Sequence, residues 1–244
     1  MPTAQNRLIE LLPREARANL LAICEPVDLV LGDILCRPGD AVRHVHFPVN
    51  GFVSLLADAD RHAGLELAMV GREGMLGAHL ALDVGRAPMQ ARVQGGGSAW
   101  RVKVVPLRRM LVQSAPLQNL LRRYVYVLMA QLASSAACLH HHHLAARLAR
   151  WLLMAQDRAH SDRFRVTQEL LGYLLGVRRV GVTAAARALQ ERGLIAYVRG
   201  DMNVRNRRGL EAQACGCYAS DAAMYARQLG ALPVCAVADS RSGR

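Results

Sequence analysis

The chain has 244 residues with a formal net charge of +12, and apolar residues make up 52% of it. This length suits one large domain or two of ordinary size, and we find neither a run of about 20 apolar residues nor the pattern of a secretory leader. We therefore expect a soluble, cytoplasmic protein with no membrane partner.

The positive charge is concentrated in the second half of the chain. Residues 1–140 carry 15 basic and 11 acidic side chains, whereas residues 141–244 carry 16 and 8. An acidic partner is therefore expected on the C-terminal half.

The first hundred residues change from helical to strand-like character. Residues 4–24 predict a short amphipathic helical region. From 27 to 105, short apolar alternations such as Val45 and Phe47 are separated by turns rich in glycine and proline. Evenly spaced short strands of this kind are typical of an antiparallel roll or barrel.

Pro116 begins a longer predicted helix that extends to Leu139. Its inner residues recur at alternating steps of four and three, which places them on one seam. Such a seam packs either within its own domain or against a symmetry mate, and we expect a homodimer. The seam of this dimer helix, assigned to residues 113–139, consists of Leu117, Leu121, Tyr124, Leu128, Gln131, Ser135 and Cys138.

Four consecutive histidines, His140–His143, precede a further predicted helix at 144–158. Neutral imidazoles bind zinc, copper or nickel, but on a continuous helix only His140 and His143 share a face. We interpret the run as a polar hinge and assign no metal ligand. A pH-sensing or metal-binding run is the alternative.

The cysteines are too sparse for a disulfide framework, so we expect reduced and mostly buried thiols. Cys215 and Cys217 are too close for an ordinary zinc knuckle and fall in a predicted terminal helix over 206–229, so we interpret them as packing residues. The six cysteines are Cys24, Cys36, Cys138, Cys215, Cys217 and Cys235.

Residues 167–208 predict two short helices, a tight turn and a basic hairpin. Thr167 can cap the first helix, and Gly176 suits the positive φ of a helix end. The second helix, from Arg178 to Arg192, leaves Arg178, Arg179, Thr183 and Arg187 facing outward. A two-stranded wing follows, with a turn that contains Arg199.

Arginines dominate this segment. Between Arg163 and Arg208 there are ten arginines and three acidic residues. A phosphate backbone is the natural partner of such a surface, so we expect binding to double-stranded DNA. The fold class is α+β. Residues 1–112 form an antiparallel β-roll, 113–139 a long helix, and 140–244 a winged helix-turn-helix with a C-terminal helix.

These motifs together resemble the Crp/Fnr family of bacterial transcription regulators over nearly the whole chain. The stretches HFPVNGFVSLL, MVGREGMLG, RLARWLLMAQDR and TQELLGYLLGVRR carry the resemblance. It implies an effector pocket in the β-roll, a homodimer that reads a palindromic site, and contact with RNA polymerase. By position, Thr167 is the phosphate-contacting cap and Gln168 and Arg179 meet DNA. Arg179 can donate two hydrogen bonds to guanine.

The sequence departs from the family at the specificity and effector positions. Val180 and Ala184 stand where well-known members have a glutamate and an arginine, so their target sequence does not transfer. The segments that hold a cyclic nucleotide's ribose and phosphate lack the required carboxylate and arginine. The corresponding effector-pocket residues here are Gly77, Ala78, His79, Met89 and Gln90.

Cyclic AMP is accordingly not expected, although Arg86 or Arg92 could substitute from a neighbouring position. With only Cys24 and Cys36 near the N-terminus, an iron-sulfur cluster is not expected either. A lone His79 is weak support for haem, so the effector stays unassigned.

Two other function classes remain as alternatives to the regulator. One is a metal-dependent enzyme that combines the histidine run with His44, His46 or His79. The other is a nonspecific nucleic-acid binder. We find no nucleophile elbow, P-loop or dinucleotide fingerprint, and therefore expect that the protein is not an enzyme.

Overall fold

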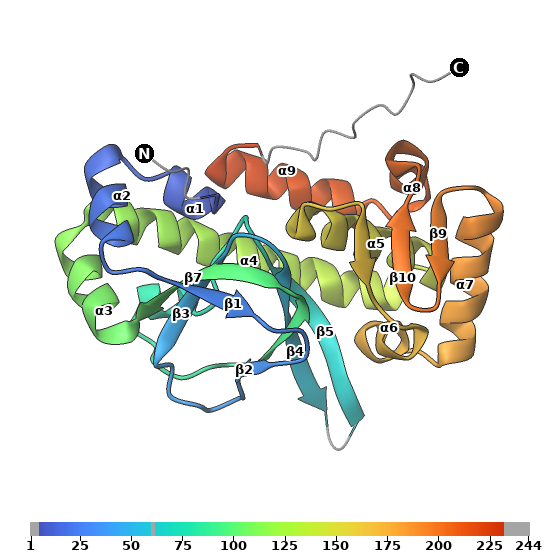
Figure 1. Cartoon of the computed structure of the whole chain (residues 1–244), viewed down its shortest axis with the longest axis horizontal. Coiled ribbons are helices and arrows are strands. Elements are labelled where there is room, and N and C mark those ends of the chain that lie inside the picture. The colour runs from blue at the N-terminus through green and yellow to red at the C-terminus, as the bar shows by residue number, and fades with distance from the viewer. Residues whose placement is uncertain (1–4, 60–61, 232–244) are drawn as a thin grey trace.

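The computed structural model describes residues 5–59 and 62–231. A β-roll, a long central helix and a smaller C-terminal half follow one another along the chain (Figure 1). Cys235 lies outside the described residues. Among the helices that the structure describes, none combines the length and apolar character needed to cross a membrane.

Two antiparallel sheets form the roll, as predicted. One sheet has the order β1-β7-β3, and the other has the order β2-β6-β4-β5. Register pairs Phe47 with Trp100, and the buried alternation of Val45 and Phe47 turns one face of β3 to the core. The strands are β1 (Glu25–Leu29), β2 (Ile34–Cys36), β3 (His44–Pro48), β4 (Phe52–Ala59), β5 (His62–Val70), β6 (Gln90–Gly95) and β7 (Gly97–Lys103).

Helices from the N-terminus and from the segment after β7 pack against the roll. Ser114 accepts a hydrogen bond from the Leu117 amide at the start of the longest helix, which has Pro116 in its first turn. These elements are α1 (Arg7–Glu10), α2 (Arg14–Leu21), the short 3₁₀ helix η1 (Ala78–Leu82), α3 (Val104–Gln113) and α4 (Ala115–His141).

The chain leaves the helical conformation within the histidine run. His142 has φ −112° and ψ 140°, His143 has φ −64° and ψ 151°, and α5 (Leu144–Ala159) begins directly afterwards. The predicted shared face of His140 and His143 is therefore wrong, because it required one continuous helix. The predicted hinge is the point where α4 and α5 meet.

The C-terminal half contains the two predicted helices and a wing with one more strand than expected. Its sheet has the order β8-β10-β9, in which β10 pairs with both neighbours. The elements are β8 (Arg163–Arg165), α6 (Gln168–Leu175), α7 (Arg179–Glu191), β9 (Ile195–Val198) and β10 (Asp201–Val204), followed by α8 (Arg207–Gln213) and α9 (Cys217–Leu229).

The predicted single terminal helix is two helices. The backbone opens at Ala214, where ψ is 152°, and α9 starts three residues later. Cys215 therefore lies in the connection and Cys217 in the first turn of α9, which corrects their assignment to one helix.

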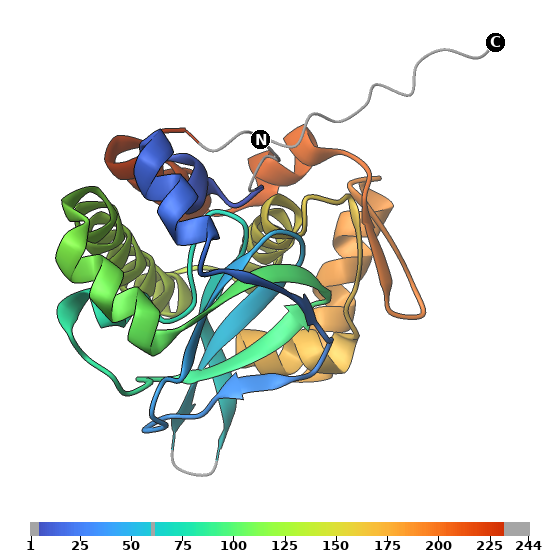
Figure 2. The ribbon, with the colours of Figure 1, turned by 60° about the vertical axis from the view of Figure 1, so that its left-hand side comes forward.

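The two halves share their hydrophobic cores. Phe52, Leu56 and Met69 of the roll pack in one cluster with Trp151 of α5 and the core of the helix-turn-helix. In the other direction, α9 lies along α4, and its end approaches α1 and α2 (Figure 2). Tyr225 of α9 is buried in the cluster of the N-terminal helices. The C-terminal helix thus packs on the half of the molecule that contains the roll.

Candidate nucleic-acid interface and effector cavity

Thr167 caps α6 as the sequence predicts. Its hydroxyl oxygen accepts a hydrogen bond of 3.1 Å from the Leu170 amide. At the other end, Gly176 has φ +64° and ends the helix. A Cβ on Gly172 would lie 2.9 Å from the Val177 carbonyl oxygen, so only glycine lets the turn approach this closely. These contacts fix the angle at which α7 leaves α6.

The second helix buries one side and exposes a polar side. Val182, Ala186 and Leu189 recur at helical spacing, so they lie on one face of α7, and this face is buried against the core. Thr183 is exposed, and its hydroxyl donates a hydrogen bond of 2.6 Å to the Gln168 side chain of α6. The exposed side of α7 is thus attached to the capped end of α6.

The tip of the wing lies beside this capped end. Arg199 and Gly200 have φ of +50° and +87°, as a two-residue turn with two left-handed positions requires. A Cβ atom built on Gly200 would lie 3.7 Å from the methyl carbon of Thr167, so the wing tip is in van der Waals reach of the α6 cap. A surface hollow lies between them, lined by Thr167, Gln168, Glu169, Arg179, Tyr197, Arg199 and Gly200.

Four of the seven predicted DNA-binding residues, Thr167, Gln168, Arg179 and Arg199, line this one hollow, and Thr183 is bonded to one of them. Arg178 is exposed at the N-cap of α7 outside the hollow.

Arg187 is exposed but forms an ion pair of 2.8 Å with Glu191. Glu169 and Tyr197, which the sequence pattern did not single out as DNA-binding residues, also line the hollow.

A second hollow of about 560 Å³ lies between the roll and α4. Gly77, Ala78, His79 and Met89 line it, as predicted for an effector pocket, whereas Gln90 is not among its lining residues. Arg43 and Asp40 are exposed residues at its wall, and the remaining lining is mainly aliphatic with His44, His46, Met75, Leu128 and Met129 among it.

Comparison with known proteins identifies the helix-turn-helix. Residues 146–213 match the family model of the Crp-like helix-turn-helix domain. The whole fold resembles FixK2 from Bradyrhizobium japonicum, with a TM-score of 0.67 at 15% identity over 79% of this chain and 98% of that one. The chain has the Crp/Fnr fold and a Crp-like helix-turn-helix domain. A search of curated proteins finds no match.

Two further solved structures share the Crp/Fnr fold. The c-di-GMP responsive regulator CLP from Xanthomonas campestris has a TM-score of 0.61 at 18% identity, over 79% of this chain and 99% of that one. A CRP/FNR-family transcriptional regulator from Thermus thermophilus has a TM-score of 0.62 at 21% identity, over 78% and 98%.

The cavity of this Crp/Fnr fold contains neutral imidazoles. Burial lowers the pKa of His46 to about 4, with the charges of His44 and Arg101 adding to the effect. Burial also lowers the pKa of His79. His46 Nδ1 and His79 Nε2 are enclosed without a hydrogen-bond partner among the described residues. Each ring can therefore donate to or accept from a bound molecule.

The predicted seam of α4 faces the interior of its own chain. Six of its seven members, Leu117, Leu121, Tyr124, Gln131, Ser135 and Cys138, are buried, and the seventh, Leu128, lines the cavity. Ser135 accepts a hydrogen bond from Arg150 of α5. The exposed side of α4 is a different one, with Tyr126 and Met129 exposed by 52% and 62%.

The histidine run does not join the cavity histidines. Among the described residues, the group of metal-type ligands that comes together contains only His142 from the run. Among the described residues, the histidine run therefore does not come together with His44, His46 or His79 into the metal site that the alternative enzyme would need.

Proposed function

We propose that the chain is a transcription regulator that binds double-stranded DNA in a sequence-specific manner. The observation that carries this proposal is the hollow in which the α6 cap, the first residue of α7 and the wing tip meet. Helix N-termini and arginines bind phosphates, and an arginine at the start of a recognition helix reaches base edges in the major groove. Thr167 and Arg199 hold the backbone while Arg179 reads a base.

Two copies are proposed to read two half-sites of a palindrome. Contact with RNA polymerase follows from the resemblance to Crp/Fnr regulators alone. The exposed side of α4, with Arg122, Tyr126, Met129, Ala133 and Ala136 at steps of four and three, offers a second seam for pairing. This face remains open, whereas the predicted seam is occupied by the chain itself.

Arg179 provides the direct test of base reading. Bound fragments of the genome are first sequenced to obtain a preferred duplex. Arg179→Ala is then expected to weaken binding to that duplex by about 1 to 3 kcal/mol more than binding to random DNA, because a bidentate contact to guanine is lost. Fluorescence anisotropy at fixed salt measures both affinities.

Arg227→Ala is the matched control, since it removes another exposed arginine, which lies on α9 and does not line the hollow. This variant is expected to weaken binding to the preferred duplex and to random DNA slightly and equally. An equal loss on both duplexes for Arg179→Ala would mean that Arg179 contacts only phosphate. A wild-type protein without any preferred duplex would favour the nonspecific binder.

The effector is proposed to be a small, mainly apolar molecule with a group that hydrogen-bonds to His46 or His79. A buried cyclic phosphate would need a cation inside the cavity. Arg86 donates instead to the Gly39 carbonyl at 2.8 Å, and neither Arg86 nor Arg92 lines the cavity. Arg43 stands exposed at the wall.

Mass spectrometry of natively purified protein is the measurement that identifies a retained molecule, and calorimetry tests cyclic AMP. We expect no heat with cyclic AMP and loss of the retained molecule in His79→Ala. Heat with cyclic AMP that disappears in Arg43→Ala would contradict this proposal.

A further inference from the structure

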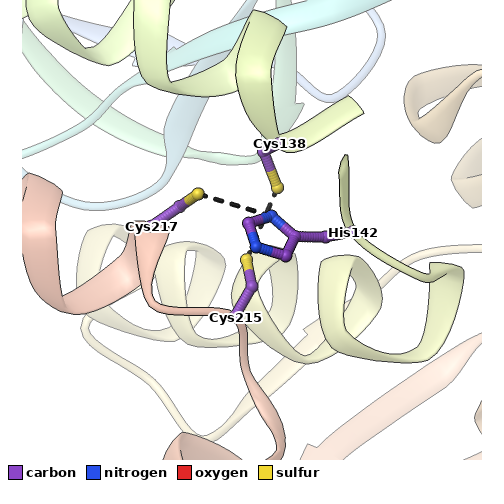
Figure 3. A group of neighbouring side chains, drawn as sticks. All are labelled: Cys138, His142, Cys215 and Cys217. Atoms are coloured by element: carbon purple, nitrogen blue, oxygen red, sulfur yellow. Dashed lines mark hydrogen bonds between the residues drawn. The ribbon is translucent and has the colours of Figure 1, made fainter. Parts of the chain in front are cut away.

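Four potential metal ligands from distant parts of the chain converge at the junction of α4 with the α8–α9 connection (Figure 3). Cys138 lies in the last turn of α4, and His142 is its C-cap. Cys215 precedes α9, and Cys217 is its first residue. Their sulfur and nitrogen atoms all lie within 4.8 Å of one another.

We propose that Cys138, His142, Cys215 and Cys217 bind one zinc ion in a tetrahedral Cys₃His site. The observed spacing fits such a site. With Zn–S near 2.3 Å and Zn–N near 2.0–2.1 Å, tetrahedral edges are about 3.8 Å between sulfurs and about 3.6 Å from sulfur to nitrogen. Cys138 Sγ lies 3.4 Å from Cys215 Sγ, and Cys217 Sγ lies 3.6 Å from His142 Nδ1.

The local backbone explains why these four side chains meet. Because α4 ends at His141, the extended conformation of His142 turns its ring toward the cysteines, while His140, His141 and His143 are not part of the group. Cys215 lies outside α9, so the two sulfurs of the Cys-x-Cys pair approach the same point. If both cysteines lay on one continuous helix, their side chains would point in directions about 200° apart around the helix axis.

Charge near the group suits three thiolates. Binding of Zn²⁺ releases three thiol protons and leaves a centre with one net negative charge. Arg147 and Arg150 of α5 lie close enough to interact electrostatically with Cys138 and Cys215. The free amides at the start of α9 add positive potential beside Cys217.

The position of the site defines what the metal would do. It links the end of α4, next to the helix break at His142 and His143, to the connection between α8 and α9. The ion is therefore a structural clasp that holds the C-terminal helices on α4, and all four ligand positions come from the protein.

Metal binding to the full chain tests the proposal. Reduced apoprotein is titrated with Zn²⁺ in competition with a chromophoric chelator, and with Co²⁺ to observe the visible bands of a tetrahedral thiolate site. We expect one equivalent per chain and a rise in Tm on binding. Cys217→Ser and His142→Ala, both at half-buried positions, are expected to weaken binding by at least about 100-fold.

Three controls make the test specific. His140→Ala and Cys36→Ser remove metal-type side chains outside the group and are expected to bind like the wild type. Far-UV circular dichroism establishes that each variant is folded, so a loss of binding reports on the ligand.

Absence of stoichiometric binding to the reduced wild type would overturn the proposal, as would equal affinity in all variants. A Cys138–Cys215 disulfide in freshly isolated protein without bound metal would also overturn it, and would identify a redox pair instead. DNA affinity is measured separately, so failure of this site leaves the proposed regulator function intact.

Discussion

Glu66 of β5 connects the roll to α5, the helix that packs against the helix-turn-helix. Its carboxylate accepts a hydrogen bond of 2.7 Å from Trp151 Nε1 and another from the Ser54 hydroxyl. Burial nevertheless raises the pKa of Glu66 to about 7, because the cost of desolvating the charge exceeds what these two donors return. The group therefore titrates near neutral pH at the junction of the two halves.

Stability should depend on pH through this carboxyl. The unfolded state loses the proton near pH 4.5 and the folded state near 7, so the folded state binds more protons between these values. The wild type's free energy of unfolding therefore falls as pH rises from 5 to 8. Glu66→Gln has no such titration, and its stability relative to the wild type is expected to rise by about 2 kcal/mol over that interval.

Urea unfolding at a series of pH values measures this difference. Glu15→Gln removes an exposed carboxylate of α2 and controls for loss of charge at the surface. A difference between Glu66→Gln and the wild type that stays constant from pH 5 to 8 would show that Glu66 does not titrate in this range.

Arg158 and Glu73 are a second connection between the halves. They form an ion pair of 3.0 Å in which both side chains are at least nine-tenths buried. Glu73 also accepts from the Gly71 amide, and Arg158 donates to the Met69 carbonyl. These contacts offset part of the cost of burying the two charges, although Glu73 Oε2 has no hydrogen-bond partner among the described residues. Removing either partner would leave the other charge buried and uncompensated.

At the scale of the element, α4 is a helix with two usable faces. Its inner face carries Leu121 and Tyr124 against the chain's own core. Its outer face carries Tyr126, Met129 and Ala133, and Tyr126 and Met129 expose large apolar area. Residues on both faces recur at alternating steps of four and three, so the sequence spacing fits either face. Only the burial of the side chains shows which face packs on the chain's own core.

Ala133→Glu should therefore dissociate the proposed dimer. In a two-fold pairing through the outer face, the new carboxylate lies near its own copy, and like charges repel in a desolvated seam. We expect a dissociation constant at least about 10-fold higher than in the wild type, which corresponds to about 1.4 kcal/mol. Sedimentation equilibrium measures it.

Val112→Glu is the control for this variant. It introduces the same charge at an exposed residue of α3, whose side chain is 87% exposed. A dimer that is equally stable in Ala133→Glu and the wild type would show that the outer face of α4 is not the contact.

At the scale of the whole molecule, the roll and the helix-turn-helix half are not independent units. Phe52 and Leu56 of β4 share a core with α5 and the helix-turn-helix, and Tyr225 of α9 donates a hydrogen bond of 2.8 Å to the Glu73 carbonyl beside the roll. A change at the cavity therefore has a packed route to the recognition helix through α4 and α5. The effector proposed above would act on DNA affinity along this route.

The sequence by itself determined the local elements and the chemistry of the surface that is proposed to face DNA. Thr167, Gly176 and the Arg199–Gly200 turn act through hydrogen bonds and backbone conformations that span a few residues, so their roles follow from residue type and spacing. The exposed arginines followed from the same periodicity. Strand alternation predicted the roll for the same reason.

Only the tertiary structure decided which distant groups meet. Cys138 and Cys215 are 77 positions apart, and the helix break at His142 and the gap between α8 and α9 bring them together. Likewise, the burial of the α4 seam by its own chain depends on packing over long sequence distances. Periodicity specifies a face, but what covers that face is a property of the whole fold.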